Sequence, residues 1–396
     1  MEAVFAYKEL FAMEKKKVGI ITLWDNNVGS ALQVMATKEI LRKHGYTGVI
    51  LSQRETKLKG KLYLRSCFHF QRLMVFLICP KRFFSIVHTI KKLKASEFHS
   101  IDVINEFVSK NIDITEVTYK DLIRIGEDES FSFFVSGSDQ VWNYTLGVLN
   151  PINFLRFAPR QKRVANAASI GVTLAPPNRW LFKKYLSEFR FISVRETSAR
   201  NIIKEYTGLS VDVVADPCLQ LDAENWRRFY KSQTHYTYTG EKYILLYFLN
   251  TENEDAKNAI DYYKANMEIR FIRVSWGQNT ISEENEYVIG PDPARFLQLI
   301  DNAFIVLTDS FHGVVFSAIF NKEFYYYKRN YVHGVDQSTR VVSLLQELGI
   351  SERFNPNEIA IVNDSSGIDY SKVNNVLAEK RRVSRDFWNS VYAAYE

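Results

Sequence analysis

One short segment of the sequence combines a side chain suited to proton transfer with groups that favour an anion. An apolar run ends at the segment TDSFHG, residues 308–313, and a second apolar run with helical character follows it. This pattern predicts a strand, a loop and the start of a helix, which Asp309 or Ser310 can cap. His312 and Gly313 then fall near the first turn, where free N–H groups and the helix dipole favour an anion. The alternative interpretation is an ordinary capped helix in which the histidine has no chemical role.

A second polar loop follows another apolar run. The segment SGSDQVWN, residues 136–143, contains a glycine, a carboxylate and an amide. Asp139 and Gln140 together can accept hydrogen bonds from a diol and donate to it. The alternative is a structural turn, in which serines of this segment bond the backbone and Trp142 fills the core. Two such loops in one chain predict a ligand cleft.

Five segments resemble motifs of the polysaccharide pyruvyl transferase family. They are GIITLWDNNVGSALQ at 19–33, SGSDQVWN at 136–143, ISVRETSA at 192–199, DVVADPCL at 212–219 and TDSFHGVVFSAIFNKEF at 308–324. The resemblance covers most of the chain, and the motifs follow the family's order, each after an apolar strand. It implies an enzyme that transfers the enolpyruvyl group of phosphoenolpyruvate to two hydroxyls of a sugar in a cell-surface polysaccharide or its precursor, leaving a pyruvate ketal. Phosphoenolpyruvate is then the donor substrate, and no separate cofactor is expected.

The reaction implied by this resemblance needs a proton shuttle. Adding a sugar hydroxyl to an enol ether requires a proton to reach the methylene carbon and another to leave the hydroxyl, and His312 is the expected catalytic residue. Well-known members of the family often have an arginine two residues before this histidine, where this chain has Ser310. Arg195, Arg340 or Lys328 could supply the missing positive charge. If none of them supplies it, a donor other than phosphoenolpyruvate is expected.

Donor binding is expected to need cations and helix N-terminal amides, because phosphoenolpyruvate carries a phosphate and a carboxylate. Arg195 follows a predicted strand and precedes a predicted helix, which makes it the first choice for an anion clamp. A surface ion pair with Glu196 or Glu205 is the alternative for this arginine. The expected donor-binding residues are Arg195, Ser310, Gly313 and Arg340.

Acceptor binding is expected at two other loops. Asp139 and Gln140 suit a pair of sugar hydroxyls, and Trp142 could stack on a sugar face. Asn27 and Gly29 belong to the first strand-to-helix loop, where a glycine allows a ligand to approach closely.

Strands and helices alternate along the chain. This pattern predicts an α/β protein with two Rossmann-like, doubly wound domains facing a cleft, similar to the GT-B fold of glycosyltransferases. The expected domains are residues 1–230, with a basic, aromatic insertion at about 57–94, and residues 231–370, which carry the TDSFHG loop. Residues 371–396 are expected to form a helical segment that could cross back to the first domain. Because a fold does not settle function, two alternatives stay open: a glycosyltransferase that uses a nucleotide sugar, and a non-catalytic glycan-binding or assembly protein.

The composition is consistent with this interpretation and decides little by itself. The chain has 396 residues, 46% of them hydrophobic, which suits two domains of ordinary size. The three cysteines form no CxxC pair and no cluster has metal-ligand spacing, so neither disulfides nor a metal is expected. GxGxxG and P-loop motifs are absent, which argues against NAD and a P-loop nucleotide site. The first residues do not resemble a secretory signal and the longest apolar run, 73–79, cannot span a bilayer, so a cytoplasmic enzyme is expected.

A basic and aromatic segment follows the second predicted strand. Residues 57–94 contain ten Lys and Arg and no Asp or Glu, whereas the formal net charge of the whole chain is only +6. With its interleaved aromatic residues, this segment has the composition of a surface that binds anionic lipid. We therefore expect a peripheral enzyme at the inner face of the cytoplasmic membrane, with an acceptor that could be lipid-linked. A solvated insertion or a contact within a homo-oligomer is the alternative, and no nucleic-acid-binding module is recognisable.

Overall fold

The structure is a computed structural model, and the residues that it describes are 16–25, 27–52, 102–144, 148–172, 175–233, 236–238, 240–275, 286–329, 338–357 and 367–396. The basic segment 57–94 lies outside these ranges. The expected membrane contact and homo-oligomer therefore stay predictions. Within the described ranges, no helix combines the length and the apolar character that crossing a membrane requires.

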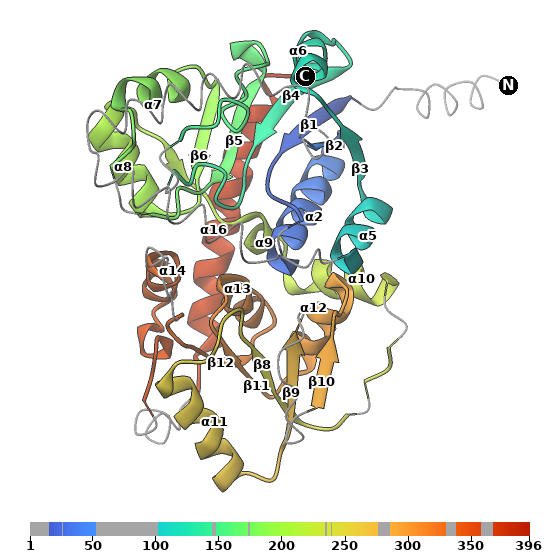
Figure 1. Ribbon diagram of the computed structural model, residues 1–396, viewed down its shortest axis with the longest axis vertical. Helices are drawn as coiled ribbons and strands as arrows, with labels where there is room; N and C mark the ends of the chain where they lie inside the picture. The colour runs from blue at the N-terminus through green and yellow to red at the C-terminus, as the bar shows by residue number, and fades with distance from the viewer. Residues whose placement is uncertain are drawn as a thin grey trace, which may run out of the picture.

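The first half of the chain forms a seven-stranded sheet in which neighbouring strands are parallel (Figure 1). Its strands are β1 (Lys17–Ile21), β2 (Thr47–Ser52), β3 (Asp113–Glu116), β4 (Phe131–Ser136), β5 (Arg163–Ala168), β6 (Phe191–Val194) and β7 (Asp212–Val213). Their order across the sheet is β3-β2-β1-β4-β5-β6-β7. The inner strand β5 is buried at every residue, as expected for a parallel sheet with both faces covered.

Helices connect these strands. They are α2 (Val28–Lys43), α5 (Asp102–Asn111), α6 (Tyr119–Glu127), α7 (Arg179–Leu186) and α8 (Thr197–Thr207), with a 3₁₀ turn at Arg160–Lys162. Parallel strands require such crossover connections, because a tight turn can join only antiparallel neighbours. Two further helices, α9 (Pro217–Gln220) and α10 (Ala223–Gln233), follow the last strand and lead to the second half.

The second half repeats this pattern around a five-stranded parallel sheet of order β10-β9-β8-β11-β12. Its strands are β8 (Tyr243–Tyr247), β9 (Arg270–Ser275), β10 (Glu286–Ile289), β11 (Ile305–Thr308) and β12 (Glu323–Tyr326). Its helices are α11 (Glu254–Asn266), α12 (Pro293–Asn302), α13 (Phe311–Ile319) and α14 (Thr339–Leu348), with a 3₁₀ turn at Ser351–Arg353. The expected fold class, two doubly wound α/β halves, is confirmed.

Capping side chains set the start of the two helices nearest the predicted site. α2 begins at Val28, because the Asn27 side chain accepts a hydrogen bond from a backbone N–H of the first turn. α13 begins at Phe311, because Ser310, one of the two capping residues that the sequence suggested, caps it in the same way. Both capping residues therefore stand where a strand ends and a helix starts.

The apolar pattern of the sequence does not mark every described element, and β3 and α6 are examples. β3 is a polar edge strand in which Asp113 and Glu116 are exposed, so no apolar alternation marks it. α6 begins with a capping box between Thr118 and Asp121, a short-range signal that the apolar pattern does not contain. Neither element lines the cavity described below.

Helix α16 (Tyr370–Tyr392) follows the second sheet in sequence but packs against the first half. Figure 1 shows it running past both halves of the molecule. Ser384 Oγ accepts a hydrogen bond from Ala215 N at 3.0 Å. Just after the helix, the Tyr395 ring stacks on Phe133 of β4, with ring centres 4.7 Å apart. At the start of the helix, the Tyr370 hydroxyl donates to the backbone carbonyl of Lys322, just before β12, so the helix contacts both halves.

The winding of the chain reverses at one place in each sheet, between β1 and β4 in the first and between β8 and β11 in the second. Ligands of doubly wound sheets bind at such places, outside the carboxyl ends of the strands. The SGSDQVWN loop follows β4 and the TDSFHG loop follows β11. Both loops that the sequence singled out therefore stand where this topology places ligands.

Candidate active site

A cavity of about 200 Å³ lies between the carboxyl ends of the two sheets. Its walls come from the loops after β1, β4, β8, β11 and β12 and from the first turn of α14. The residues that line it are Leu23, Asn27, Asp139, Gln140, Leu249, Ser310, Phe311, His312, Arg329 and Arg340. The residues that the sequence suggested but that do not line it are Gly29, Trp142, Arg195, Gly313 and Lys328.

His312 lies between the two sheets, as the second residue of α13. Only 6% of the residue is exposed. Its ring packs against the first turn of α2, so closely that a Cβ atom at Gly29 would lie 2.1 Å from His312 Nδ1. Its Nε2 is 4.0 Å from Asp216 Oδ2 and makes no hydrogen bond to any described residue. α13 thus carries this ring from the second half into contact with the first.

Burial sets the protonation state of His312. It lowers the pKa of His312, and the nearby carboxylates of Asp216 and Asp139 offset this effect only in part. The imidazole is therefore neutral at pH 7 and can accept a proton. The buried Asp216 carboxylate stands close enough to stabilise the imidazolium that would form.

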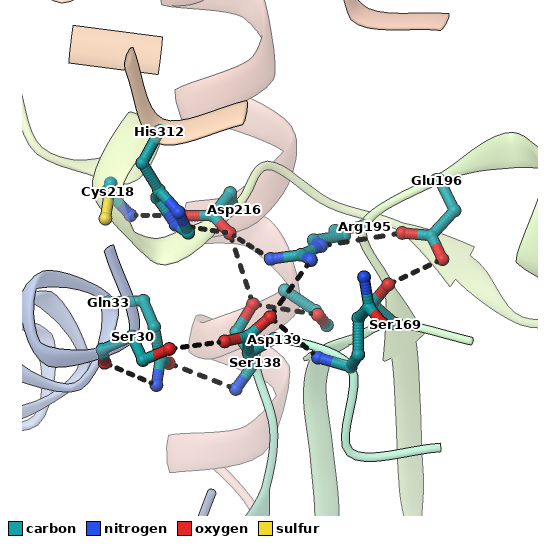
Figure 2. A network of polar contacts seen from close by, with 12 residues as sticks. Ser30, Gln33, Ser138, Asp139, Ser169, Arg195, Glu196, Asp216, Cys218 and His312 are labelled. Atoms are coloured by element: carbon teal, nitrogen blue, oxygen red, sulfur yellow. Dashed lines mark hydrogen bonds and ion pairs between the residues drawn. The ribbon is translucent and has the colours of Figure 1, made fainter. Parts of the chain in front are cut away.

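Arg195 lies beside the cavity, at the centre of a buried ion-pair network (Figure 2). Its Nη1 donates to Asp216 Oδ2 at 2.8 Å and its Nη2 to Asp139 Oδ1 at 3.5 Å. Its Nε is 3.6 Å from Glu196 Oε2, and only 1% of its side chain is exposed. Burial alone would lower the pKa of Arg195, but the three carboxylates outweigh it and the pKa is raised.

This geometry corrects the alternative in which Arg195 forms an ion pair at the protein surface. The pair with Glu196 exists, but it is buried, and Asp216 and Asp139 add two further carboxylates. The positive charge of Arg195 is therefore balanced inside the protein. Direct contact between Arg195 and the donor stays a prediction.

Asp139 connects this network to α2 and to the cavity. Its Oδ2 accepts a hydrogen bond from Ser30 Oγ at 2.8 Å, and its Oδ1 accepts one from Gln140 N at 2.9 Å. Burial would raise the pKa of Asp139, but nearby cations, led by Arg195, outweigh it and the pKa is lowered. Asp139 is therefore a carboxylate at neutral pH, able to accept a hydrogen bond from a hydroxyl in the cavity.

Trp142 does not reach the cavity, so the expectation that it stacks on a sugar is wrong. Its ring stacks on Phe154 with centres 5.3 Å apart, its Nε1 donates to a backbone carbonyl at 3.1 Å, and only 1% of the residue is exposed. Ser136 and Ser138 donate to backbone carbonyls, as the structural alternative expected. Only the middle of this loop lines the cavity.

Two glycines that were expected to contact ligands instead allow close packing within the protein. At Gly29, the His312 ring occupies the space that a Cβ would need. At Gly313, a Cβ would lie 2.4 Å from Thr308 Oγ1, so the close contact is between α13 and the end of β11. The group that approaches Gly29 is thus a side chain of the protein and not a substrate.

Replacing Gly29 with alanine should displace the His312 ring, because the added Cβ would overlap it. We expect the free energy of unfolding to fall by about 1 to 3 kcal/mol, the usual cost of overpacking. In a His312→Ala background the same substitution should cost little, since the overlapping ring is gone. Chemical denaturation of the wild type, both single variants and the double variant measures this coupling. Equal costs in the two backgrounds would show that the ring does not rest on Gly29.

Two arginines from the second half line the cavity. Arg340, in the first turn of α14, has its guanidinium 5.4 Å from the centre of the Phe311 ring, and Arg195 lies 4.9 Å from the same ring. Burial and the neighbouring Arg195 lower the pKa of Arg340 to about 10, so it stays a cation at neutral pH. Arg329, just after β12, donates from Nη2 to the carbonyl oxygen of Asp309 at 3.0 Å.

The motifs in the sequence did not single out Arg329 or Asp216. Asp216 belongs to the DVVADPCL segment just after β7, and Arg329 follows β12 closely. In both cases the available signal was a charged residue at the carboxyl end of a predicted strand. That signal does not say which of several polar residues there faces the site.

Three buried residues could also offer ligands to a metal ion. Candidate atoms of Asp216, Cys218 and His312 lie within 4.8 Å of one another, which their spacing in the sequence does not reveal. Arg195 donates to the same Asp216 carboxylate, however, and places a cation against it. Burial, reinforced by Asp216, raises the pKa of the Cys218 thiol and keeps it protonated. Both features oppose a metal here, and metal independence stays a prediction.

Comparison with solved structures places this architecture in the GT-B class. UDP-N-acetylglucosamine 2-epimerase from Neisseria meningitidis, solved with UDP-GlcNAc, is similar over 94% of this chain and 100% of its own, with a TM-score of 0.52 and 10% identity. The S. aureus protein MnaA, solved with UDP, is similar over 95% of this chain and 96% of its own, with a TM-score of 0.51 and 10% identity. At such low identity the similarity establishes the fold alone. The protein is thus a GT-B fold protein with a cavity between its two sheets.

A family model narrows this class. The model of the polysaccharide pyruvyl transferases matches residues 27–331, most of the chain. The protein therefore belongs to the polysaccharide pyruvyl transferase family, as its sequence motifs indicated. A comparison with curated protein sequences gives no significant match.

Proposed function

We propose that the protein transfers the pyruvyl group of phosphoenolpyruvate to two hydroxyls of a sugar in a cell-surface polysaccharide or its precursor. Family membership supports the reaction type. The observation that carries the proposal at the site is that a buried, neutral histidine, a carboxylate and two arginines line one cavity. This combination supplies a base for a hydroxyl and positive charge for an anionic donor.

The proposed reaction joins two hydroxyls to one carbon of the donor. The first sugar hydroxyl bonds to C2 of phosphoenolpyruvate while C3 gains a proton and becomes a methyl group. The second hydroxyl then replaces the phosphate at C2. Of the two protons that the hydroxyls lose, one accounts for the new C–H bond and the other leaves with the phosphate.

His312 is the proposed proton shuttle. Its lowered pKa keeps it unprotonated at neutral pH, so that it can remove a proton from an attacking hydroxyl. Asp216, 4.0 Å away, would stabilise the imidazolium until the proton is passed on. Burial strengthens this electrostatic interaction, because little water screens it.

The two sides of the cavity suggest where donor and acceptor bind. The first half contributes a carboxylate and amides that suit sugar hydroxyls, from Asp139, Gln140 and Asn27. The second half contributes the cations and a capped helix start that suit an anionic donor, from Arg329, Arg340 and Ser310. We propose these two sets as the acceptor side and the donor side.

Donor preference is the sharpest test of this function. The protein is incubated with phosphoenolpyruvate and acceptor glycans, and phosphate release is followed together with the mass of the glycan, which a pyruvate ketal increases. Thermal unfolding with phosphoenolpyruvate or with common nucleotide sugars tests the donor without an acceptor, because a ligand that binds the native state stabilises it. We expect stabilisation by phosphoenolpyruvate. Stabilisation by a nucleotide sugar alone would favour a glycosyltransferase, and no response to either class would favour a non-catalytic glycan-binding protein.

A further inference from the structure

Two cations from the second half, Arg329 and Arg340, form a wall of the cavity together with residues 310–312. We propose that these two arginines bind the phosphate group of the donor, and that Arg329 supplies the positive charge that Ser310 lacks. The inference rests on the proposed function for the identity of the donor. The anion site itself can be tested without any turnover.

The register of the second sheet explains how Arg329 reaches this wall. β11 and β12 are neighbours, with Thr308 paired to Tyr326, so the residues that follow them meet at one edge of the sheet. Arg329 Nη2 donates to the carbonyl oxygen of Asp309 at 3.0 Å, which holds the guanidinium next to the residue that caps α13. Asp309 is fixed in turn by Leu249 N, which donates to its Oδ1 at 2.7 Å. Arg329 is therefore held in place, with 17% of its side chain still exposed.

The charges around the cavity favour an anion on this wall. Among the described residues, the charged side chains that line the cavity are Arg329, Arg340 and Asp139. Arg329 also pairs with the buried carboxylate of Asp309, whose Oδ2 lies 3.4 Å from Arg329 Nε. The Asp139 carboxylate already accepts hydrogen bonds from Ser30 and from Arg195, on the side of the first sheet. Burial is the main cause that lowers the pKa of Arg340, and the charge of Arg195 adds to it, while the carboxylates of Asp139 and Glu196 act in the opposite direction. An anion beside Arg340 would offset the cost of burying its charge.

Two helices also direct their N-terminal turns at this wall. α13 has nine residues and α14 has ten, and their first turns reach the cavity through Phe311, His312 and Arg340. The N-terminal ends of helices carry partial positive charge, which adds to that of the arginines. The two arginines and the two helix ends thus converge on one anion.

The test compares binding of inorganic phosphate and of phosphoenolpyruvate by isothermal titration calorimetry. Arg329→Gln removes the charge but keeps an amide that can donate to the Asp309 carbonyl. Arg228→Gln is the matched control, because it removes the same charge from an arginine whose side chain is 75% exposed and which does not line the cavity. We expect Arg329→Gln to weaken binding of both anions roughly 10- to 150-fold, the scale of one charge-assisted contact. Arg228→Gln should bind them like the wild type. Arg340→Gln should resemble Arg329→Gln, and it carries the test if Arg329→Gln does not fold.

Several outcomes separate this inference from the proposed function. Wild-type affinity of Arg329→Gln for both anions, or no binding of either anion by the wild type, would overturn the site. Adding Ser310→Arg to Arg329→Gln should restore part of the affinity, because a guanidinium returns to the same wall. If the affinity does not recover, the proposal that Arg329 supplies the charge that Ser310 lacks would be wrong. Phosphate binding that depends on Arg329, without turnover of phosphoenolpyruvate, would support the site and contradict the proposed function. If Arg329→Gln leaves the turnover of phosphoenolpyruvate unchanged, that result would support the proposed function and contradict the site.

Discussion

Replacing His312 with alanine should lower pyruvyl transfer by about 10²- to 10⁴-fold, the usual scale for the loss of a general acid or base. The fold should survive, because the ring lies at the cavity wall. Initial rates of phosphate release at saturating donor and acceptor measure the effect. Circular dichroism and thermal unfolding of the same samples check the fold.

The pH dependence of the rate gives a more specific readout of His312. Because burial lowers its pKa, the wild-type rate should decline on the acidic side with an apparent pKa below the ordinary histidine value. The base becomes protonated as the pH falls through this pKa and can then no longer accept a proton from the hydroxyl. The residual activity of His312→Ala should lack this acidic decline.

His44 provides a matched control. It forms the C-cap of α2, stacks on Tyr392 with ring centres 3.9 Å apart, and does not line the cavity. His44→Ala should therefore turn over like the wild type. Wild-type turnover in a folded His312→Ala protein would remove His312 from the mechanism.

Replacing Arg195 with alanine should lower the free energy of unfolding by about 3 to 5 kcal/mol, the usual cost of breaking a buried ion pair. The substitution leaves Asp216, Asp139 and Glu196 buried without the guanidinium that balances them. Buried carboxylates without a partner are costly, because they lose water and gain no compensating charge. Chemical denaturation at neutral pH measures the change.

An exposed pair serves as the control for Arg195. Arg228→Ala removes an arginine whose side chain is 75% exposed and which pairs with Glu224, so it should cost at most about 1 kcal/mol. The cost of Arg195→Ala should also shrink as the pH falls, because the carboxylates left behind can then bind protons in the folded state. A cost that matches the exposed control at neutral pH would mean that the network does not stabilise the fold, and would return Arg195 to the role of donor clamp.

The sequence by itself determined the fold class and the loops that carry the site. The pattern of apolar residues is a local property, so the strand that was predicted just before Arg195 is present in the structure as β6, Phe191–Val194. Parallel strands present their carboxyl ends at one edge of a sheet. Polar residues after predicted strands, among them Asp139 and His312, could therefore be assigned to one cleft from the order of strands and loops along the chain.

Only the tertiary structure decided which way each side chain of those loops faces. Asp139 and Trp142 belong to one loop, yet the first lines the cavity and the second fills the core. Gly29 and His312 lie far apart in sequence, and their contact depends on how the two sheets pack. The role of Arg195 shows the physical reason. An exposed arginine can bind a donor, whereas a buried one among three carboxylates balances charge within the fold, and burial and partners arise only when distant segments pack together.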